Sequence, residues 1–342
     1  MAKKNQIEPE VCDYFNKCSQ NSKTTQAWFR MPNWLGDCIM VYPVLKAIRK
    51  QRPDFCIHLV CKKYLAPLLQ RYFPAEFIHV IPQASGLNYF KDFFAIRKQH
   101  PDLWFNFTNS SRSDIEAWCS GAPRRFGLRR GFRPLLTHLY AYNKAKENEH
   151  HTELWYRFAQ NFGLKEPLSR DPINVPVIPQ EITQVACFFG SANAPEKRWP
   201  VFRWQNFIRS FLKKHPNVTY ILLGGEKEQE IGNEIIMSLP KDRINNLTGK
   251  TSLIQLIQIL ETSDFVIGND SGGMHLSNFL GIPTVGLFGL SNPSWGGPFY
   301  EAPKCIIKSS TNNISDLLED EVLDQIMNWL SNLKKAQASS IC

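Results

Sequence analysis

The chain has 342 residues, of which 43% are hydrophobic and 21% are charged. This balance excludes a disordered chain, and the length suits two domains better than one ordinary core. The formal net charge of +9 favours an anionic partner, such as nucleic acid, an acidic membrane or a phosphorylated substrate, without deciding among them.

The cysteines and the apolar runs indicate the compartment. None of the nine cysteines forms a CxxC pair, and several lie in apolar, strand-like runs. This is typical of reduced thiols in a cytosolic protein and not of a disulfide framework or a zinc site. Residues 1–25 form a polar extension without the apolar core of a signal peptide. No apolar run reaches the ~18 residues that span a bilayer. We therefore expect a cytoplasmic protein that is at most peripheral on a membrane.

The first half of the chain alternates between strand-like and helix-like patterns. Short runs rich in aromatic and β-branched residues predict strands at 27–31, 55–61, 77–81 and 102–108. Helical spacing of apolar residues predicts helices from Asp37 onward and at 64–73, 89–99 and 112–119. Alternation of this kind predicts a parallel sheet with helices on both faces.

A proline-rich joint follows, and the alternation then starts again. The prolines of the joint are Pro167, Pro172, Pro176 and Pro179. Strands are expected at 185–190, 217–225, 264–268 and 283–289, and helices at 201–215, 227–239, 252–260, 274–280 and 315–334. The sequence therefore predicts an α/β fold of two doubly wound domains, 26–178 and 179–342, that face each other across a cleft. Ligands of such sheets bind beyond the carboxyl ends of the strands, here in the loops 31–37, 190–199 and 268–273.

The loop GNDSGGMH (268–275) follows a predicted strand and opens a helix. Ser271, Gly272 and Gly273 would leave backbone N–H groups open to an anion, and the helix dipole would add to the attraction, so a diphosphate fits. A plain helix cap at Asp270 or Ser271 explains the pattern equally well. Neither a GxGxxG nor a Walker motif is present, which argues against a dinucleotide-binding protein and an NTPase.

The loop GSANAPEKRWP (190–200) also leaves the end of a predicted strand. Ser191 and Asn193 could hydrogen-bond a nucleotide, and Lys197 and Arg198 could neutralise a phosphate. A solvated basic loop is the competing interpretation, and on the pattern alone it is slightly favoured.

Asp37 lies where the first strand meets the first helix, in PNWLGD (32–37). As an N-cap it would stabilise the helix by ~1 kcal/mol. As a carboxylate in a cleft it could act as a general base, and the helix dipole would keep it ionised at neutral pH. On position alone, the cap is the commoner role.

A run of arginines in APRRFGLRRGFRP (122–134) could bind phosphate or carboxylate groups, and a lysine at the end of the second strand could join them. The competing interpretation is solubilising charge. The candidate acceptor-binding residues are Arg124, Arg125, Arg129, Arg130 and Lys62.

No metal-binding pattern is evident in the sequence. The chain has no HExxH motif, and no DxD follows a predicted strand. We therefore expect that no divalent metal holds the phosphates of a substrate.

Three motifs in order carry a family resemblance: W-x-G-D at 34–37, KRWP at 197–200 and NDSG-x-MH at 269–275. Together they resemble glycosyltransferase family 9, in particular the ADP-heptose:lipopolysaccharide heptosyltransferases, and most of all the heptosyltransferase II branch. The likeness covers about residues 26–295. Three ordered motifs are far more specific than one.

The resemblance implies a GT-B fold with an N-terminal acceptor domain and a C-terminal donor domain. It implies an inverting, metal-independent transfer of heptose from ADP-L-glycero-D-manno-heptose to the inner core of lipopolysaccharide, without a cofactor. The acceptor would be an anionic, lipid-linked oligosaccharide. The enzyme would then be cytoplasmic, with peripheral contact at the inner face of the inner membrane and no nucleic-acid partner.

The resemblance also implies roles for single residues. Asp37 matches the family's proposed base, and Lys197 matches a lysine that contacts the donor phosphate. Glu226 or its neighbour Glu228 matches a residue that holds the ribose or base. The positions that match the donor-lining segment are Asp270, Ser271, Gly272 and His275. The family has leucine where this chain has Gly273, so we expect a looser loop there.

Two alternatives stay open. The chain could be a family 9 transferase with another sugar donor or core position. It could instead be a non-catalytic protein that binds nucleotide or nucleic acid through its basic surface, although it carries no recognised nucleic-acid-binding module.

Overall fold

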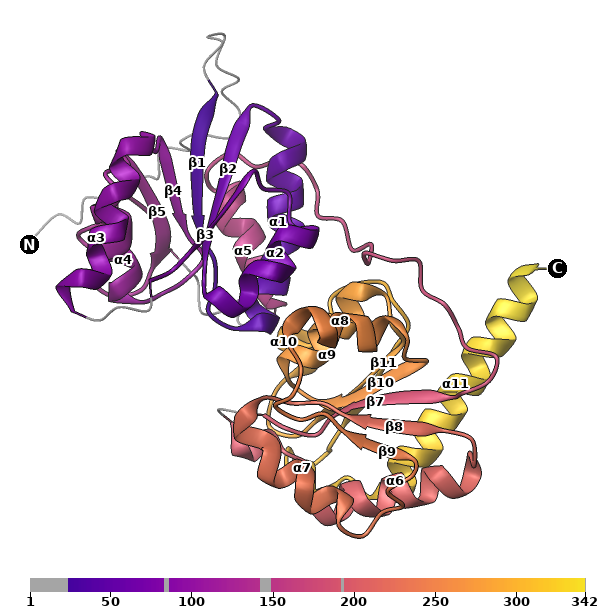
Figure 1. The fold of residues 1–342 in the computed structure, drawn as a ribbon. Coiled ribbons are helices and arrows are strands. Elements are labelled where there is room, and N and C mark those ends of the chain that lie inside the picture. The colour runs from indigo at the N-terminus through magenta and orange to yellow at the C-terminus, as the bar shows by residue number, and fades with distance from the viewer. Residues whose placement is uncertain (1–23, 83–85, 142–148, 192–193, 342) are drawn as a thin grey trace, which may run out of the picture. The chain divides into compact units, whose positions relative to one another are not determined.

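The structure is a computed structural model that describes residues 24–82, 86–141, 149–191 and 194–341. The chain forms two compact units (Figure 1). The first comprises Met1–Asn33 and Met40–Ser169, and the second comprises Trp34–Ile39 and Arg170–Cys342. The short segment Trp34–Ile39, which contains the W-x-G-D motif, therefore belongs with the C-terminal unit.

The first unit contains a six-stranded sheet in the order β3-β2-β1-β4-β5-β6, and its described strand pairs are all parallel. The strands are β1 (Thr25–Arg30), β2 (Phe55–Cys61), β3 (Phe77–Val80), β4 (Leu103–Asn106), β5 (Arg124–Arg129) and β6 (His138–Ala141). Helix α1 (Leu35–Gln51) belongs to this unit from Met40 onward, and its first residues, up to Ile39, belong to the second unit. The other helices are α2 (Ala66–Tyr72), α3 (Leu87–Ala95), α4 (Ser111–Cys119) and α5 (His151–Gln160). Figure 1 shows α3 and α4 on one face of the sheet and α1, α2 and α5 on the other.

The second unit repeats this plan, with a parallel six-stranded sheet in the order β12-β11-β10-β7-β8-β9. The strands are β7 (Gln184–Phe188), β8 (Thr219–Leu222), β9 (Ile244–Asn246), β10 (Phe265–Asn269), β11 (Thr284–Phe288) and β12 (Lys304–Lys308). The helices are α6 (Val201–Lys214), α7 (Gln229–Ile236), α8 (Leu253–Glu261), α9 (Gly272–Leu280), α10 (Pro293–Gly296) and α11 (Glu319–Ile341). The predicted α/β class with two doubly wound parallel sheets is therefore confirmed.

The pattern of α6 shows why the predicted helices form. Trp204, Phe207, Ile208 and Phe211 recur at helical spacing and are fully buried in the core of the second unit. Lys213 and Lys214 lie in the last turn, where the helix dipole favours cations. The start of α6 follows Pro200, as the motif KRWP predicts.

The sequence prediction missed several elements. Strands β5, β6, β9 and β12 and helix α5 were not expected. The omission of β5 matters most for the site, because it had been interpreted only as a basic surface. Its middle residues Phe126 and Leu128 are buried, so an alternating strand pattern lay between the arginines.

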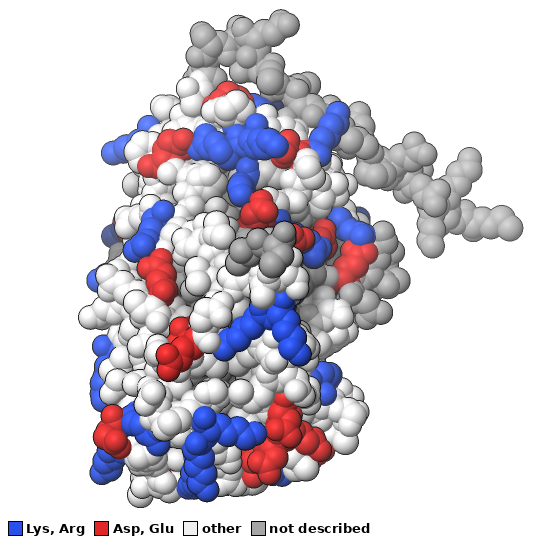
Figure 2. All heavy atoms as spheres, turned by 90° about the vertical axis from the view of Figure 1, so that its right-hand side faces the viewer, with Lys and Arg blue, Asp and Glu red and all other residues white. Residues whose placement is uncertain are grey.

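The surface charge is mixed on the face that Figure 2 shows, where Lys and Arg side chains are interspersed with Asp and Glu. A continuous basic stripe is the footprint expected of a nucleic-acid-binding face, and this face lacks one. Among the helices of the described residues, none is long and apolar enough to span a membrane.

Candidate active site

Side-chain hydrogen bonds of Asn269 fix the start of the turn between β10 and α9. This residue ends β10 and is fully buried. Its side-chain Nδ2 donates to the Phe189 carbonyl at 2.5 Å, and its Oδ1 accepts the Trp199 backbone N–H at 3.4 Å. The single amide thus ties the end of β10 to the segment that follows β7 and to the KRWP motif. Two of the predicted ligand loops are therefore held together.

Ser271 occupies the N-cap position of α9 but does not cap the helix with its side chain. Its buried Oγ has no hydrogen-bond partner among the described residues. A buried hydroxyl without a partner is costly unless a ligand or water completes it. The simple cap interpretation therefore leaves the Ser271 hydroxyl unexplained, whereas an anion at the helix N-terminus would use it.

Lys197 and Asp270 form an ion pair next to the N-terminus of α9. The Lys197 Nζ lies 2.6 Å from the Asp270 Oδ2, and the two side chains are 32% and 10% exposed. Lys197 ends the 3₁₀ helix Pro195–Lys197. The pair joins residues that are 73 positions apart in the chain. An ammonium has three donors, so Lys197 can bind Asp270 and still donate to an incoming anion.

The loop before Lys197 is braced by Arg198. Its guanidinium Nε and Nη2 donate to the Ser191 carbonyl at 3.0 and 2.8 Å. These hydrogen bonds occupy two N–H donors of Arg198, a residue that was predicted to neutralise a phosphate. Ser191 itself is half-buried. Asn193, also predicted to bind the donor, lies outside the described residues.

Asp37 lies in the same region of the second unit. Helix α1 begins at Leu35, so Asp37 is in its first turn, and the N-cap interpretation is wrong. Burial raises the pKa of the Asp37 carboxyl above its ordinary value of 3.8, Lys197 lowers it, and Asp270 raises it. Three charged residues that the sequence had placed in three separate loops are thus electrostatically coupled.

The first turn of α1 is packed tightly against α9. A Cβ at Gly36 would lie 2.8 Å from the His275 Cδ2, and one at Gly272 would lie 3.1 Å from the Leu35 Cβ. His275 is 6% exposed. Glycine at position 36 is therefore required by a close approach inside a helix, although from the sequence it reads as a turn residue.

Tyr300 also links the first residues of α1 to α9. The sequence analysis did not single out this residue. Its phenolic OH, in a side chain that is 1% exposed, donates to the Ile39 carbonyl at 3.0 Å. Its backbone N–H donates to the Asn278 Oδ1 at 2.7 Å. Tyr300 thus connects α9 to the backbone two residues beyond Asp37. No local pattern could have revealed this, because the contact spans 261 residues.

Of the two glutamates considered for the ribose or base, Glu226 is exposed and Glu228 is 7% exposed. The Glu228 Oε2 accepts the Gly225 backbone N–H at 2.8 Å. A Cβ at Gly190 would lie 1.9 Å from the Glu228 Oε1. The Glu228 carboxylate therefore lies just beyond the carboxyl ends of β7 and β8. Ligands of parallel sheets bind at this edge.

The expectation of a loosened loop at Gly273 is wrong. Gly273 is the second residue of α9, and a Cβ there would lie 2.4 Å from the ring of Phe188. Phe188, at the end of β7, is 6% exposed. The phenylalanine ring thus fills the space into which a side chain at position 273 would have to fit.

We predict that Gly273→Leu destabilises the protein by about 1–3 kcal/mol, because it overpacks this contact. Adding Phe188→Ala should restore part of the lost stability. Differential scanning fluorimetry would measure the Tm values. Gly296→Ala is the matched control, because a Cβ there meets nothing within 4 Å. A Gly273→Leu protein that melts like the parent would contradict the close approach.

The predicted arginines lie at two different edges of the first sheet. Arg124 and Arg125 begin β5, whereas Arg129 ends it and Arg130 follows. Six strand residues place the two ends ~16 Å apart. Lys62 directly follows β2, at the same carboxyl edge as Arg129 and Arg130. In a parallel sheet this edge is the one that meets ligands.

A further arginine from the run is structural. Arg133 is 7% exposed, and its guanidinium donates to the Asp114 carboxylate at 2.8 and 2.5 Å and to the Leu128 carbonyl at 2.6 Å. The five arginines of segment 122–134 therefore do not form one surface. Within the described residues, no group of three His, Cys, Asp or Glu side chains could hold a metal ion.

Comparison with known proteins supplies the context for this arrangement. The sequence profile of Glycosyltransferase family 9 (heptosyltransferase) matches residues 91–326, which is more than half of the chain. Lipopolysaccharide heptosyltransferase 2 of Escherichia coli K12 is 25% identical over 306 residues, which cover 80% of this chain and 86% of that protein. Lipooligosaccharide heptosyltransferase 2 of Campylobacter jejuni serotype O:2 is 25% identical over 89% of this chain and 98% of its own length.

Solved structures show the same fold. The structure described as E. coli ADP-heptose lps heptosyltransferase II superposes with a TM-score of 0.79 at 22% identity, covering 91% of this chain and all of that chain. E. coli heptosyltransferase WaaC with ADP superposes with a TM-score of 0.71 at 17% identity, covering 89% of this chain and all of that one. The two parallel sheets described above therefore form a GT-B fold.

Proposed function

The chain belongs to glycosyltransferase family 9, the heptosyltransferase family, and we propose from this premise that it transfers heptose from ADP-L-glycero-D-manno-heptose to the inner core of lipopolysaccharide. The names of its relatives support heptose as the sugar and a lipopolysaccharide as the acceptor. The observation that carries the proposal is the coupling of Asp37, Lys197 and Asp270 beside the N-terminus of α9.

In the proposed reaction the donor diphosphate binds at the N-terminus of α9, next to Lys197 and the Ser271 hydroxyl. The acceptor hydroxyl oxygen attacks the anomeric carbon of the heptose while the bond from that carbon to the phosphate oxygen breaks. The electron pair of this bond leaves with ADP, so negative charge grows on the diphosphate. Lys197 and the helix N-terminus stabilise that charge. Attack from the face opposite ADP inverts the anomeric configuration.

Asp37 accepts the proton of the attacking hydroxyl. A general base works best when its pKa lies near the working pH, and burial moves the pKa of Asp37 upward in that direction. Lys197 limits the rise in the pKa of Asp37, so the carboxylate stays available as a base. The same lysine would therefore serve the leaving group and the base.

We assign the donor to residues 179–342 and the acceptor to residues 26–178. The proposed donor residues are Lys197, Ser191, Asn193, Asp270, Ser271, Gly272, Gly273 and His275, with Glu226 or, by its burial, Glu228 at the ribose or base. No cofactor takes part. The proposed acceptor is lipid-linked, so we place the enzyme in the cytoplasm with peripheral contact at the inner face of the inner membrane.

The test of this function is direct transfer. Purified protein, the ADP-heptose donor and a lipopolysaccharide acceptor that lacks the second heptose should yield an acceptor heavier by one heptose, read by mass spectrometry. Parallel reactions with ADP-glucose and UDP-glucose test for another sugar donor. Transfer from one of these sugars, and none from ADP-heptose, would contradict the proposal.

The same assay tests whether transfer requires a divalent metal ion. We predict that excess EDTA leaves the turnover unchanged, because Lys197 and the N-terminus of α9 would supply the positive charge that a metal supplies elsewhere. A loss of turnover in EDTA that magnesium or manganese restores would contradict this part of the proposal.

We predict that Arg129→Ala and Arg130→Ala raise the acceptor KM more than the donor KM, each by about tenfold, because each removes one charge-assisted contact to an anionic acceptor. Arg124 and Arg125 are also predicted acceptor residues, but they lie at the amino edge of the sheet. Arg124→Ala is therefore the informative comparison. An equal effect at both edges, measured by steady-state kinetics, would mean that the strand-edge argument misplaces the acceptor.

A further inference from the structure

Two aromatic side chains stand exposed on the outer surface of the helical layer formed by α3 and α4. Phe94 is 42% exposed and Trp118 is 45% exposed. Their rings meet edge to face, with centroids 6.0 Å apart and planes at 80°. The neighbouring residues Phe93 and Ala117 face inward and are buried in the core. The two rings are therefore not needed to fill the core of this layer.

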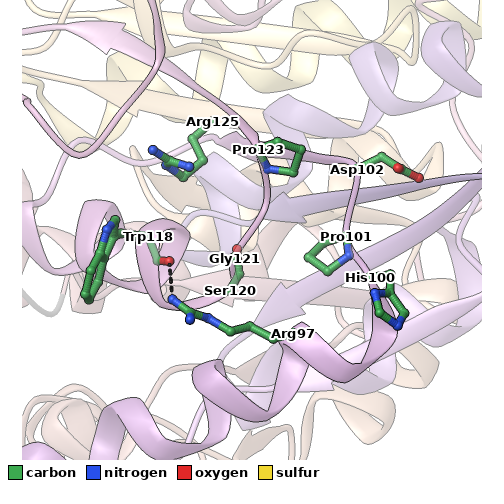
Figure 3. A pocket seen from close by; sticks show the side chains of 9 residues that line it. All are labelled: Arg97, His100, Pro101, Asp102, Trp118, Ser120, Gly121, Pro123 and Arg125. Atoms are coloured by element: carbon green, nitrogen blue, oxygen red, sulfur yellow. Dashed lines mark hydrogen bonds between the residues drawn. The ribbon is translucent and has the colours of Figure 1, made fainter.

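Arg97 lies beside both rings. Its guanidinium carbon lies 4.9 Å from the centroid of Phe94 and 5.9 Å from that of Trp118. Its Nε donates to the Cys119 carbonyl at 2.9 Å, and its Nη2 donates to the Trp118 carbonyl at 3.5 Å (Figure 3). The cation is thus fixed at the surface beside two apolar rings.

An open pocket adjoins these residues (Figure 3). Arg125 lines it and is also fixed, since its Nε donates to the Leu135 carbonyl at 2.7 Å and its Nη1 donates to the Ala122 carbonyl at 2.6 Å. Asp102 is the acidic residue among those lining the pocket, and Figure 3 shows it on the side away from Trp118. Among the described residues, the pocket is lined by Arg97, His100, Pro101, Asp102, Trp118, Ser120, Gly121, Pro123 and Arg125.

The exposed charges around the rings are mainly basic. The segment 87–100 carries Lys91, Arg97 and Lys98 against the single acid Asp92. The two acids of α4 are buried and paired: Asp114 with Arg133, and Glu116 with Arg30. Exposed aromatic rings framed by cations match the boundary between lipid headgroups and acyl chains.

We propose that the patch formed by Phe94, Arg97, Trp118 and Arg125 docks the enzyme on the anionic surface of a lipid bilayer. Phe94 and Trp118 insert at the headgroup boundary. The guanidinium N–H groups of Arg97 and Arg125 that do not donate to backbone carbonyls bind headgroup phosphates. The inference rests on the proposed function, which requires a lipid-linked acceptor. It also gives a role to Arg125 at the amino edge of β5.

Vesicle flotation tests the aromatic part. The full chain should float with vesicles of equal parts phosphatidylglycerol and phosphatidylcholine. Phe94→Ala and Trp118→Ala should each weaken binding about tenfold, because each removes apolar surface that would be buried in lipid. Phe202→Ala is a matched control, because Phe202 is 54% exposed on α6 and has the Arg203 guanidinium 5.1 Å from its ring centroid. The control should bind like the parent.

Charge variants test the headgroup part. Lys98→Gln should weaken binding to the phosphatidylglycerol vesicles about fivefold at low salt, an effect that salt should screen. It should leave binding to pure phosphatidylcholine vesicles unchanged. Lys213→Gln, at an exposed position of α6, should behave like the parent on both.

The outcomes separate this inference from the proposed function. With a delipidated, soluble acceptor the Phe94→Ala and Trp118→Ala variants should transfer heptose at the parent rate. Parent-like vesicle binding by the Phe94→Ala/Trp118→Ala double variant would overturn the inference and leave the proposed function intact. A parent dimer that the double variant splits, without any vesicle binding, would also overturn it and make this face a contact between copies. A parent protein that binds vesicles but transfers nothing would contradict the function alone.

Discussion

Asp37→Asn should lower kcat by about 10²- to 10⁴-fold, the usual cost of losing a general base. Asparagine keeps the size and polarity of the side chain but cannot accept the proton of the acceptor hydroxyl. Affinity for ADP should stay close to that of the parent, because the diphosphate is proposed to contact Lys197 and α9. Steady-state kinetics and calorimetry measure the two quantities.

The same change should leave the Tm unchanged or raise it. Burial holds the pKa of Asp37 above its unfolded value, so the folded state binds the proton more tightly than the unfolded chain. The stability that this provides is present below the unfolded pKa and is lost as the pH rises through the folded pKa. At neutral pH the ionised carboxylate thus costs stability that the neutral asparagine does not. Asp37 is not the N-cap of α1, so the change does not remove an N-cap side chain.

The pH profile of kcat supplies a second readout. The acid limb should lie above the range of an exposed aspartate, because protonated Asp37 is inactive. Asp270 raises the pKa of Asp37 and Lys197 lowers it, so Asp270→Asn should move the limb to lower pH and Lys197→Gln should move it to higher pH. Asp242→Asn, at an exposed position, is the control and should leave the acid limb where it is in the parent. An Asp37→Asn enzyme with parent-like kcat would remove Asp37 from the mechanism.

Local patterns predicted the sheet architecture because strand and helix periods are carried by neighbouring residues. The apolar spacing of α6 and the polar loops at the ends of β7 and β10 are examples. Strand β5 was missed because arginines occupy both of its ends and only Phe126 and Leu128 show the alternation. Gly36 reads as a turn because glycine is a poor helix former, yet the contact with His275 requires it inside α1.

The arrangement of the site could not be predicted in the same way. The sequence pointed to three loops because the carboxyl ends of parallel strands gather ligand-binding residues, and the structure brings charged residues of these loops together. It could not show that Lys197 pairs with Asp270, because that contact depends on how β7 and β10 lie side by side in the folded sheet. The role of Tyr300 depends likewise on a tertiary contact. Burial separates Glu228 from Glu226, and two glutamates two positions apart in one short 3₁₀ helix do not differ in pattern.

Lys197→Ala should weaken ADP binding by about 10- to 100-fold, which corresponds to the loss of one charge-assisted hydrogen bond of about 1.5–3 kcal/mol. It should lower kcat further, by about 10²- to 10³-fold, because the charge on the leaving diphosphate grows in the transition state. Isothermal titration calorimetry with ADP and steady-state kinetics measure the two effects. Lys213→Ala, at an exposed position of α6, is the control for the loss of a lysine.

The ion pair with Asp270 makes this prediction sharper. In Lys197→Ala the Asp270 carboxylate, which is 10% exposed, loses the ammonium 2.6 Å away. It would then repel the diphosphate at short range. The double variant Lys197→Ala/Asp270→Asn should therefore bind ADP more tightly than Lys197→Ala alone. A double-mutant cycle isolates this coupling, because the two side chains are in direct contact. If the double variant binds ADP as weakly as the single one, Asp270 only orients Lys197; if Lys197→Ala binds ADP like the parent, the diphosphate lies elsewhere.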